Sequence, residues 1–215
     1  MTKLRKLLKF VIKPFEKVWY NKNENRVVNG VGIMKWLFEN KGSLSAIGLA
    51  EYIKDRYYNK FGKEISSLKL QKCLYFCFAY WAGFVVKDDS NTEMKEIEEN
   101  LNPILFDDRI EAWSYGPVVP HVFRHQKDCE SGVTSKDVCK KLLEATKSKL
   151  EENETLKGAI DDILDDLFLI SDFGLVSMSH NDRSWQENYN ENDIKHNREI
   201  PKEQIINEYS KKAFN

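Results

Sequence analysis

Two histidines and a cysteine have a spacing that could hold a metal ion. His121, His125 and Cys129 stand four residues apart, which places them on one face if a single helix carries all three. Imidazole and thiolate are ligands that zinc accepts, so a metal-dependent enzyme built on these residues is one hypothesis. No further Cys–His pair at ligand spacing follows, and a partly exposed helix explains the pattern without a metal. We therefore expect no metal here.

Other potentially reactive side chains have simpler explanations. Cys73 and Cys77 lie in the most apolar run of the chain, where a thiol acts as a small hydrophobe and lacks the exposure of a reactive one. The pairs Asp161-Asp162 and Asp165-Asp166 could bind a divalent cation, but a solvated acidic helix face explains them. The triplet Asp-Phe-Gly at 172–174 lacks the other kinase motifs. The sequence predicts no catalytic residue, no cofactor and no enzymatic activity.

Composition favours one substantial domain. The 215 residues are 41% hydrophobic and 12% aromatic, enough for a buried core. A net charge of −1 argues against general polyanion binding. Four cysteines do not form the framework of a small secreted domain, so we expect the reducing cytoplasm. The longest apolar run, residues 73–86, is too short to span a bilayer.

The first 22 residues differ in charge from the remainder. They contain seven Lys or Arg against Glu16 alone, a net +6, which leaves −7 for the rest. Their apolar residues recur at helical spacing, although Pro14 should kink such a helix. This segment could pack on its own domain, dock in a partner protein, contact an anionic membrane or bind nucleic acid. Among the binding modes we favour a protein partner, with no specific nucleic acid and no membrane contact expected. The residues that would make the contact are Leu8, Val11, Ile12, Phe15 and Trp19.

Hydrophobic periodicity predicts a mainly α fold. The run at about 67–86 is apolar nearly all round, which is typical of a helix at the centre of a domain. We expect Ser66 or Ser67 to cap it and Gly174 to end a later helix. The turn-like Asp107-Asp108 predicts a short β-hairpin near 104–115. Further helices are expected over 44–61, 121–129, 136–150, 156–170 and 200–214, with an amino-terminal helical extension.

The stretch LFDDRIEAWSYGPVVP at 105–120 should be rigid. Pro117 and Pro120 restrict the backbone, and Gly116 precedes the first of them. On a strand, Glu111, Trp113 and Tyr115 would share one face. Rigid aromatic surface suits recognition better than proton transfer.

Two motifs resemble the signature of a known family. LKLQKCLYF at 68–76 and LFDDRIEAWSYGPVVPHVFR at 105–124 are similar to the Panacea domain, the SocA-like antitoxin domain of bacterial and prophage toxin–antitoxin pairs. A weaker third element is Ser179-His180 followed by Ser184-Trp185, where Ser184 stands in place of the family's proline. The resemblance covers roughly 44–212. It implies a mainly helical domain that neutralises a cognate toxin by direct binding, and some members deliver the toxin to a protease as adaptors.

This resemblance divides the chain and names candidate residues. We expect a basic extension at 1–43 and a Panacea-like domain at 44–215 with an acidic insertion at 88–102. Buried Leu70, Leu74 and Trp113 should specify the fold. Gln71, Glu111 and Tyr115 should be accessible, unless they form an internal hydrogen-bond network. A regulator that binds nucleic acid through the amino terminus stays an alternative. The candidate partner-binding residues of the motifs are Lys69, Gln71, Lys72, Tyr75, Glu111, Trp113, Tyr115, Gly116 and Pro117.

Overall fold

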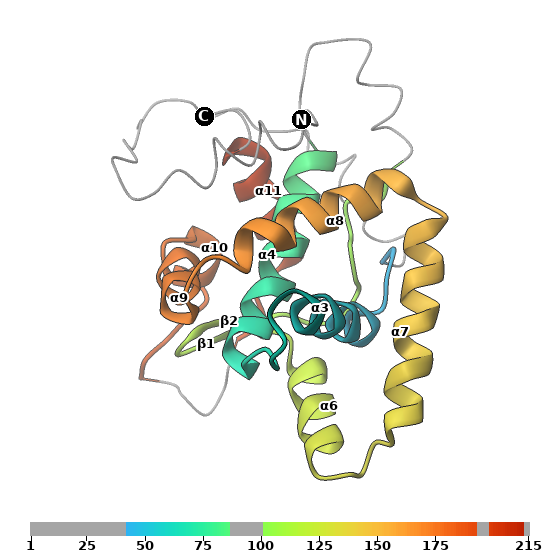
Figure 1. The fold of residues 1–215 in the computed structure, drawn as a ribbon. Coiled ribbons are helices and arrows are strands. Elements are labelled where there is room, and N and C mark those ends of the chain that lie inside the picture. The colour runs from blue at the N-terminus through green and yellow to red at the C-terminus, as the bar shows by residue number, and fades with distance from the viewer. Residues whose placement is uncertain (1–41, 87–100, 193–197, 213–215) are drawn as a thin grey trace.

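The structure, a computed structural model, describes residues 42–86, 101–192 and 198–212 (Figure 1). Within these ranges the chain forms eight helices and one two-stranded antiparallel hairpin, which confirms the predicted mainly helical class. Residues 1–41 of the expected amino-terminal extension and residues 88–100 of the expected acidic insertion lie outside the described residues. No helix in the described ranges combines the length and the hydropathy needed to cross a membrane.

The central helix is α4, Ser67–Val85, as its composition predicts. The Ser66 hydroxyl caps it by accepting the Lys69 backbone N–H at 3.0 Å. Its large side chains, among them Tyr75 and Trp81, are buried, and neighbouring helices surround it (Figure 1). The other elements are α3 Ala46–Phe61, β1 Glu111–Trp113, β2 Gly116–Val118, α6 Pro120–Glu130, α7 Lys136–Glu151, α8 Glu154–Leu167, α9 Asp172–His180, α10 Arg183–Gln186 and α11 Lys202–Lys212.

The acidic residues of α8 do not all face solvent. The Tyr52 hydroxyl of α3 donates to Asp161 at 2.6 Å. Arg56 of α3 pairs with Asp161 at 2.8 Å and with Asp165 at 3.2 Å. Burial and the bond to Asp161 raise the pKa of Tyr52 to about 12. Both aspartates join α8 to α3; the expected solvated face is wrong at Asp161, whereas the Asp165 side chain is still 37% exposed.

The hairpin exists, but its turn is not at Asp107-Asp108. Strands β1 and β2 pair across a turn at 114–115, with Glu111 opposite Val118. The apolar residues expected in the first strand instead run beside the segment before α3, where the Ser43 and Leu44 N–H groups donate to the carbonyls of 104 and 105 at 3.0 and 2.8 Å. On its other side β1 contacts residues 198–200, since the Ala112 N–H donates to the Arg198 carbonyl at 2.9 Å.

The prediction that Gly174 ends a helix is also wrong. Helix α8 stops at Leu167, and Gly174 lies in the first turn of α9. There its N–H donates to the hydroxyl of the cap residue Ser171 at 3.1 Å. A glycine near a helix boundary does not by itself say which helix it belongs to.

Candidate functional site

Two buried side chains of α4 hold the hairpin. The Gln71 carbonyl oxygen Oε1 accepts the Val119 N–H at 2.8 Å, and Lys72 Nζ donates to the Pro117 carbonyl at 2.7 Å. Gln71 is 2% exposed and Lys72 0%. The expectation that Gln71 is accessible is therefore wrong, and the alternative of an internal hydrogen-bond network is confirmed for it. Side chains of the motif at 68–76 therefore fix the backbone of the motif at 105–124.

Lys72 is buried without a carboxylate partner among the described residues. Desolvation disfavours its charged form and lowers its pKa from 10.5 to about 7. A neutral amine can still donate to the Pro117 carbonyl. The position of this nitrogen beneath the hairpin therefore carries a free-energy cost at neutral pH.

Gly116 is required in the hairpin for two reasons. Its φ is +95°, a conformation that side chains with a Cβ rarely adopt. A Cβ at this position would lie 2.8 Å from Lys72 Nζ and would overlap the buried Ser179 hydroxyl. The glycine thus permits both the turn and the close approach of β2 to α4 and α9.

An aromatic stack supports the hairpin from the side of α9 and α10. The rings of His180 and Trp185 are stacked with centroids 4.0 Å apart, and Tyr189 stacks on Trp185 at 4.7 Å. Trp185 Nε1 donates to the Trp113 carbonyl at 3.0 Å. Burial and the nearby Lys72 lower the pKa of His180, which favours the neutral ring. The third motif element therefore contacts the second.

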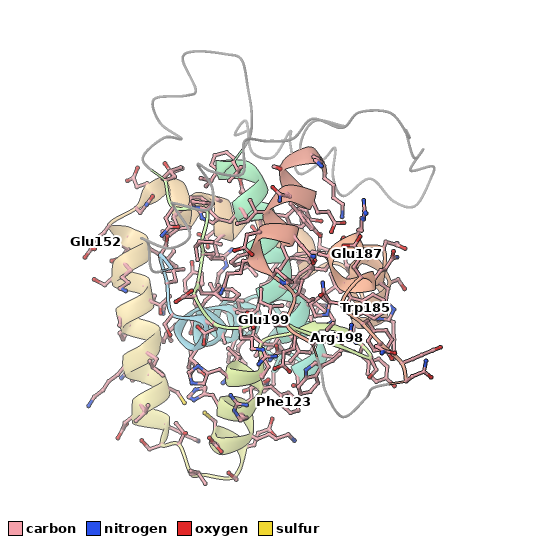
Figure 2. All side chains as sticks on the ribbon, turned by 180° about the vertical axis from the view of Figure 1, so that it is seen from behind. Phe123, Glu152, Trp185, Glu187, Arg198 and Glu199 are labelled. Atoms are coloured by element: carbon pink, nitrogen blue, oxygen red, sulfur yellow. The ribbon has the colours of Figure 1, made fainter. Side chains whose placement is uncertain are left out.

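The outer side of the hairpin is aromatic and partly exposed. Tyr115 at the turn is 59% exposed, as expected. Trp113 is only half-buried rather than buried, and its Nε1 donates to Glu111 at 2.9 Å. Phe123 of α6 packs against Trp113 with ring centroids 5.2 Å apart. Figure 2 shows Phe123 on the side of the molecule that carries the hairpin. We call Glu111, Trp113, Tyr115 and Phe123 the hairpin face.

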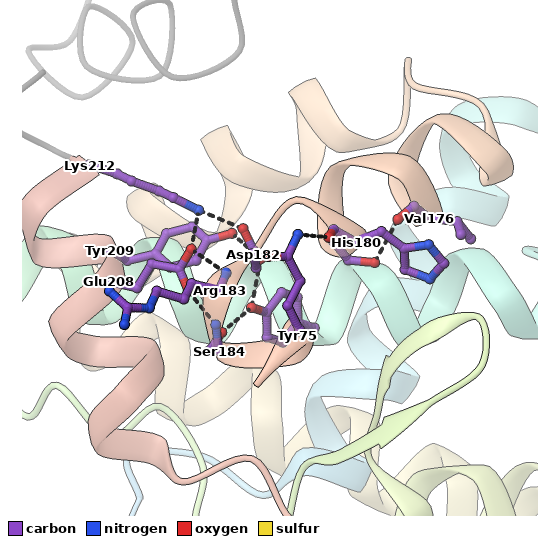
Figure 3. Close-up of polar contacts among 11 residues, drawn as sticks. Tyr75, Val176, His180, Asp182, Arg183, Ser184, Glu208, Tyr209 and Lys212 are labelled. Atoms are coloured by element: carbon purple, nitrogen blue, oxygen red, sulfur yellow. Dashed lines mark hydrogen bonds and ion pairs between the residues drawn. The ribbon is translucent and has the colours of Figure 1, made fainter. Parts of the chain in front are cut away.

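A second buried network centres on Asp182 (Figure 3). Its carboxylate accepts hydrogen bonds from Tyr75 at 2.6 Å, Tyr209 at 2.8 Å and Lys212 at 2.5 Å. Burial raises the pKa of Asp182 although Lys212 opposes the shift. Tyr75, a candidate for partner contact, is fully buried. It joins α4 to α10 and α11 instead of facing solvent.

Glu208 of α11 caps the short helix α10. Its carboxylate accepts the Arg183 and Ser184 N–H groups at 3.0 and 2.9 Å. Burial opposes ionisation, but the Lys212 ammonium 2.8 Å away and these two bonds lower the pKa of Glu208. Proline, the family residue at position 184, could not donate the second bond. The i, i+4 spacing of Glu208 and Lys212 was a signal in the sequence, but nothing local marked Asp182 as a second partner of Lys212.

The candidate motif residues fall into two groups. Lys69, Gln71, Lys72, Tyr75, Gly116 and Pro117 are buried, whereas Glu111, Trp113 and Tyr115 reach the surface. Lys69 Nζ, for example, lies 3.5 Å from Asp172 and above the ring of Tyr57. Whether any candidate contacts a partner stays a prediction. The amino-terminal candidates Leu8, Val11, Ile12, Phe15 and Trp19 lie outside the described residues.

The three residues considered as metal ligands in the sequence do not come together as a set. His121 Nδ1 lies 2.7 Å from an oxygen of Asp108, whereas His125 Nε2 lies 3.5 Å from the Cys129 sulfur. Cys73 and Cys77 are buried in the core, as expected, and burial raises the pKa of Cys73 to about 12.

Comparison with protein families confirms the resemblance. Residues 91–186 match the family model described as antitoxin SocA-like, Panacea domain. The matched range includes the hairpin, His180 and Trp185, while the motif at 68–76 lies before it. No curated protein and no solved structure matches the chain.

Proposed function

We propose that this protein is an antitoxin that binds a cognate protein toxin and neutralises it, with the hairpin face as part of the contact. The proposal is based on the hydrogen bonds that hold this hairpin in a fixed position on the helices. Lys72 bonds to Pro117 in β2, Gln71 bonds to Val119 directly after β2, and Trp185 bonds to the carbonyl of Trp113 in β1. A preorganised aromatic surface loses little conformational entropy on binding, and Trp and Tyr are frequent at the energetic centres of interfaces.

The same contacts favour binding over catalysis. The buried polar motif residues have structural partners: Gln71 accepts the Val119 backbone N–H, and Tyr75 donates to the Asp182 carboxylate. These bonds fix the shape of the hairpin and of α10. The family match supports the antitoxin role, and the unpaired thiols support a reducing cytoplasm as the place of the encounter.

The first test is growth rescue. The neighbouring open reading frame is expressed with and without the full chain, and the purified proteins are mixed to measure a complex. We expect toxicity, rescue by this protein and a direct complex. A harmless neighbour, or a toxic one that is neither bound nor rescued, would overturn the proposal. A fall in toxin level that depends on a protease would identify the adaptor mode rather than masking.

A matched pair of variants locates the contact. Tyr115→Ala removes an exposed ring from the hairpin face, and Tyr58→Ala removes a tyrosine of similar exposure from α3. We expect Tyr115→Ala to weaken the complex about tenfold or more, and Tyr58→Ala to leave it unchanged. Equal effects of the two variants would exclude the hairpin face as the specific contact.

The amino-terminal segment is tested by deletion. Removing residues 1–41 leaves Ser43 to donate to the carbonyl of Ile104, so the bond that joins the segment before α3 to residue 104 is kept. Rescue by the shortened protein would locate neutralisation in the Panacea-like domain. Rescue by the full chain alone, with the shortened protein folded by circular dichroism, would make the basic segment part of the contact.

A further inference from the structure

Three helices bring four metal-binding side chains together away from the hairpin. Glu51 comes from α3, His125 and Cys129 from α6, and Cys139 from α7, and one donor atom of each lies within 4.8 Å of all the others. The Glu51 carboxylate is 3.4 Å from His125 Nε2. The Cys129 sulfur is 3.5 Å from the same nitrogen and 3.2 Å from the Cys139 sulfur. We call these four residues the α3–α6–α7 cluster.

Two of the three shortest donor–donor distances match a tetrahedral zinc site, and all four donors lie within 4.8 Å of one another. With Zn–S near 2.3 Å and Zn–N or Zn–O near 2.0 Å, tetrahedral angles separate sulfur and nitrogen by about 3.5 Å, nitrogen and oxygen by about 3.3 Å and two sulfurs by about 3.8 Å. The first two values match those of the cluster, 3.5 and 3.4 Å. The sulfurs, at 3.2 Å, would need to separate by about 0.6 Å. Both cysteines are near helix ends, Cys129 in the last turn of α6 and Cys139 in the first turn of α7.

We propose that the α3–α6–α7 cluster binds one Zn²⁺ ion at a structural site. Two thiolates and an imidazole select zinc over the hard cations. Four protein ligands leave no open position, which is the arrangement of a structural rather than a catalytic site. The ion would join α6, the helix that follows the hairpin, to α3 and α7. This role does not depend on the antitoxin proposal.

The surroundings of the cluster match the charge that such a site would have. Two thiolates, one carboxylate and Zn²⁺ sum to −1. Lys54 Nζ lies 3.0 and 3.1 Å from the two Glu51 oxygens, so its ammonium balances that charge and orients the carboxylate. Glu51 and His125 side chains are 9% and 10% exposed, while both cysteines are half-buried. The half-buried sulfurs leave a path for the ion to enter.

A disulfide between Cys129 and Cys139 is the competing explanation of the short sulfur distance. It would form with loss of two protons and two electrons to an external oxidant. It would give no reason for a nearly buried His125 and Glu51 to converge on the same point. The test must therefore separate metal binding from thiol oxidation.

The experiment uses the reduced full-length protein. Zinc is measured by elemental analysis, and Co²⁺ is titrated as a spectroscopic probe, because thiolate-to-cobalt charge transfer and tetrahedral d–d bands report the ligands directly. We expect one zinc per chain and both cobalt signatures. Cys129→Ser and Cys139→Ser should weaken zinc binding about 100-fold or more, and Lys54→Gln about tenfold. His121→Ala, on the same helix but outside the cluster, should bind as the unaltered protein does.

The spectra of the unaltered chain keep the test valid if a cysteine variant does not fold. Reduced protein that binds no zinc and shows no charge-transfer band with cobalt would overturn the proposal. Equal zinc content in Cys139→Ser and in the unaltered protein would also overturn the proposal. A Cys129–Cys139 disulfide in protein purified without reductant, with no metal uptake after reduction, would replace the metal site by a redox-active thiol pair.

Discussion

Replacing Lys72 by methionine should change how the stability of the protein depends on pH. Methionine keeps an unbranched side chain in the space of the lysine stem but cannot carry charge. The pKa of Lys72 is lowered from 10.5 to about 7 by burial. Between these values the unfolded chain holds a proton on Lys72 that the folded chain has released. Stability therefore rises with pH across this window in the unaltered protein.

The size of the effect follows from the same shift. Each proton bound only by the unfolded chain changes the free energy of unfolding by about 1.4 kcal/mol per pH unit. At pH 7 the folded Lys72 is about half protonated, and by about pH 9 it is neutral, whereas the unfolded lysine stays largely charged. Lys72 should therefore add about 2 kcal/mol to the free energy of unfolding between those two pH values.

Urea unfolding of both proteins at about pH 7 and pH 9 measures this contribution. All other titratable groups are common to both proteins, so the contributions of those that do not interact with Lys72 cancel in the difference. We expect the gain in stability from pH 7 to pH 9 to be about 2 kcal/mol larger in the unaltered protein than in Lys72→Met. Equal pH dependence of the two proteins would refute a depressed pKa at Lys72 and, with it, a desolvated amine beneath the hairpin.

Three further substitutions, the first with a matched control, test the contacts of the hairpin and the Asp182 network. Gly116→Ala should lower the free energy of unfolding by roughly 2–4 kcal/mol, because it places a Cβ on a residue with positive φ and makes that Cβ clash with α4 and α9. The control Gly132→Ala is also at positive φ but has open space around it, so it should cost only about 1 kcal/mol. Equal losses for the two variants in denaturant unfolding would exclude the close approach of β2 to α4 and α9. Trp185→Phe keeps an aromatic ring but not the bond to the Trp113 carbonyl, so we expect a loss of about 1 kcal/mol and weaker toxin binding in a titration. Asp182→Ala removes the carboxylate that Tyr75, Tyr209 and Lys212 share, so it should lower the free energy of unfolding by roughly 3–5 kcal/mol. A loss below about 1 kcal/mol would show that water replaces the carboxylate.

The sequence alone determined the elements of the fold that depend on local pattern. An all-round apolar run predicts α4 because only a central position buries every face of a helix. Ser66 caps that helix because its hydroxyl reaches an N–H three residues on. The turn-like Asp107-Asp108 predicted a hairpin near 104–115, and a hairpin does form in this part of the chain, but its strands are 111–113 and 116–118 with the turn at 114–115. Each of these predictions concerns residues close together in the chain.

Only the tertiary structure decided which polar residues face inward and what they contact. Gln71 and Lys72 are as polar as surface residues, but they point at the hairpin because α4 passes beneath it. Asp182 receives bonds from residues 107 positions before it and 30 after it. His125 and Cys129 were visible as a pair in the sequence, whereas Glu51 joins them only because α3 packs on α6. Local periodicity predicts where a helix forms, but the contacts between distant polar groups depend on how the helices pack, which no short window of sequence contains.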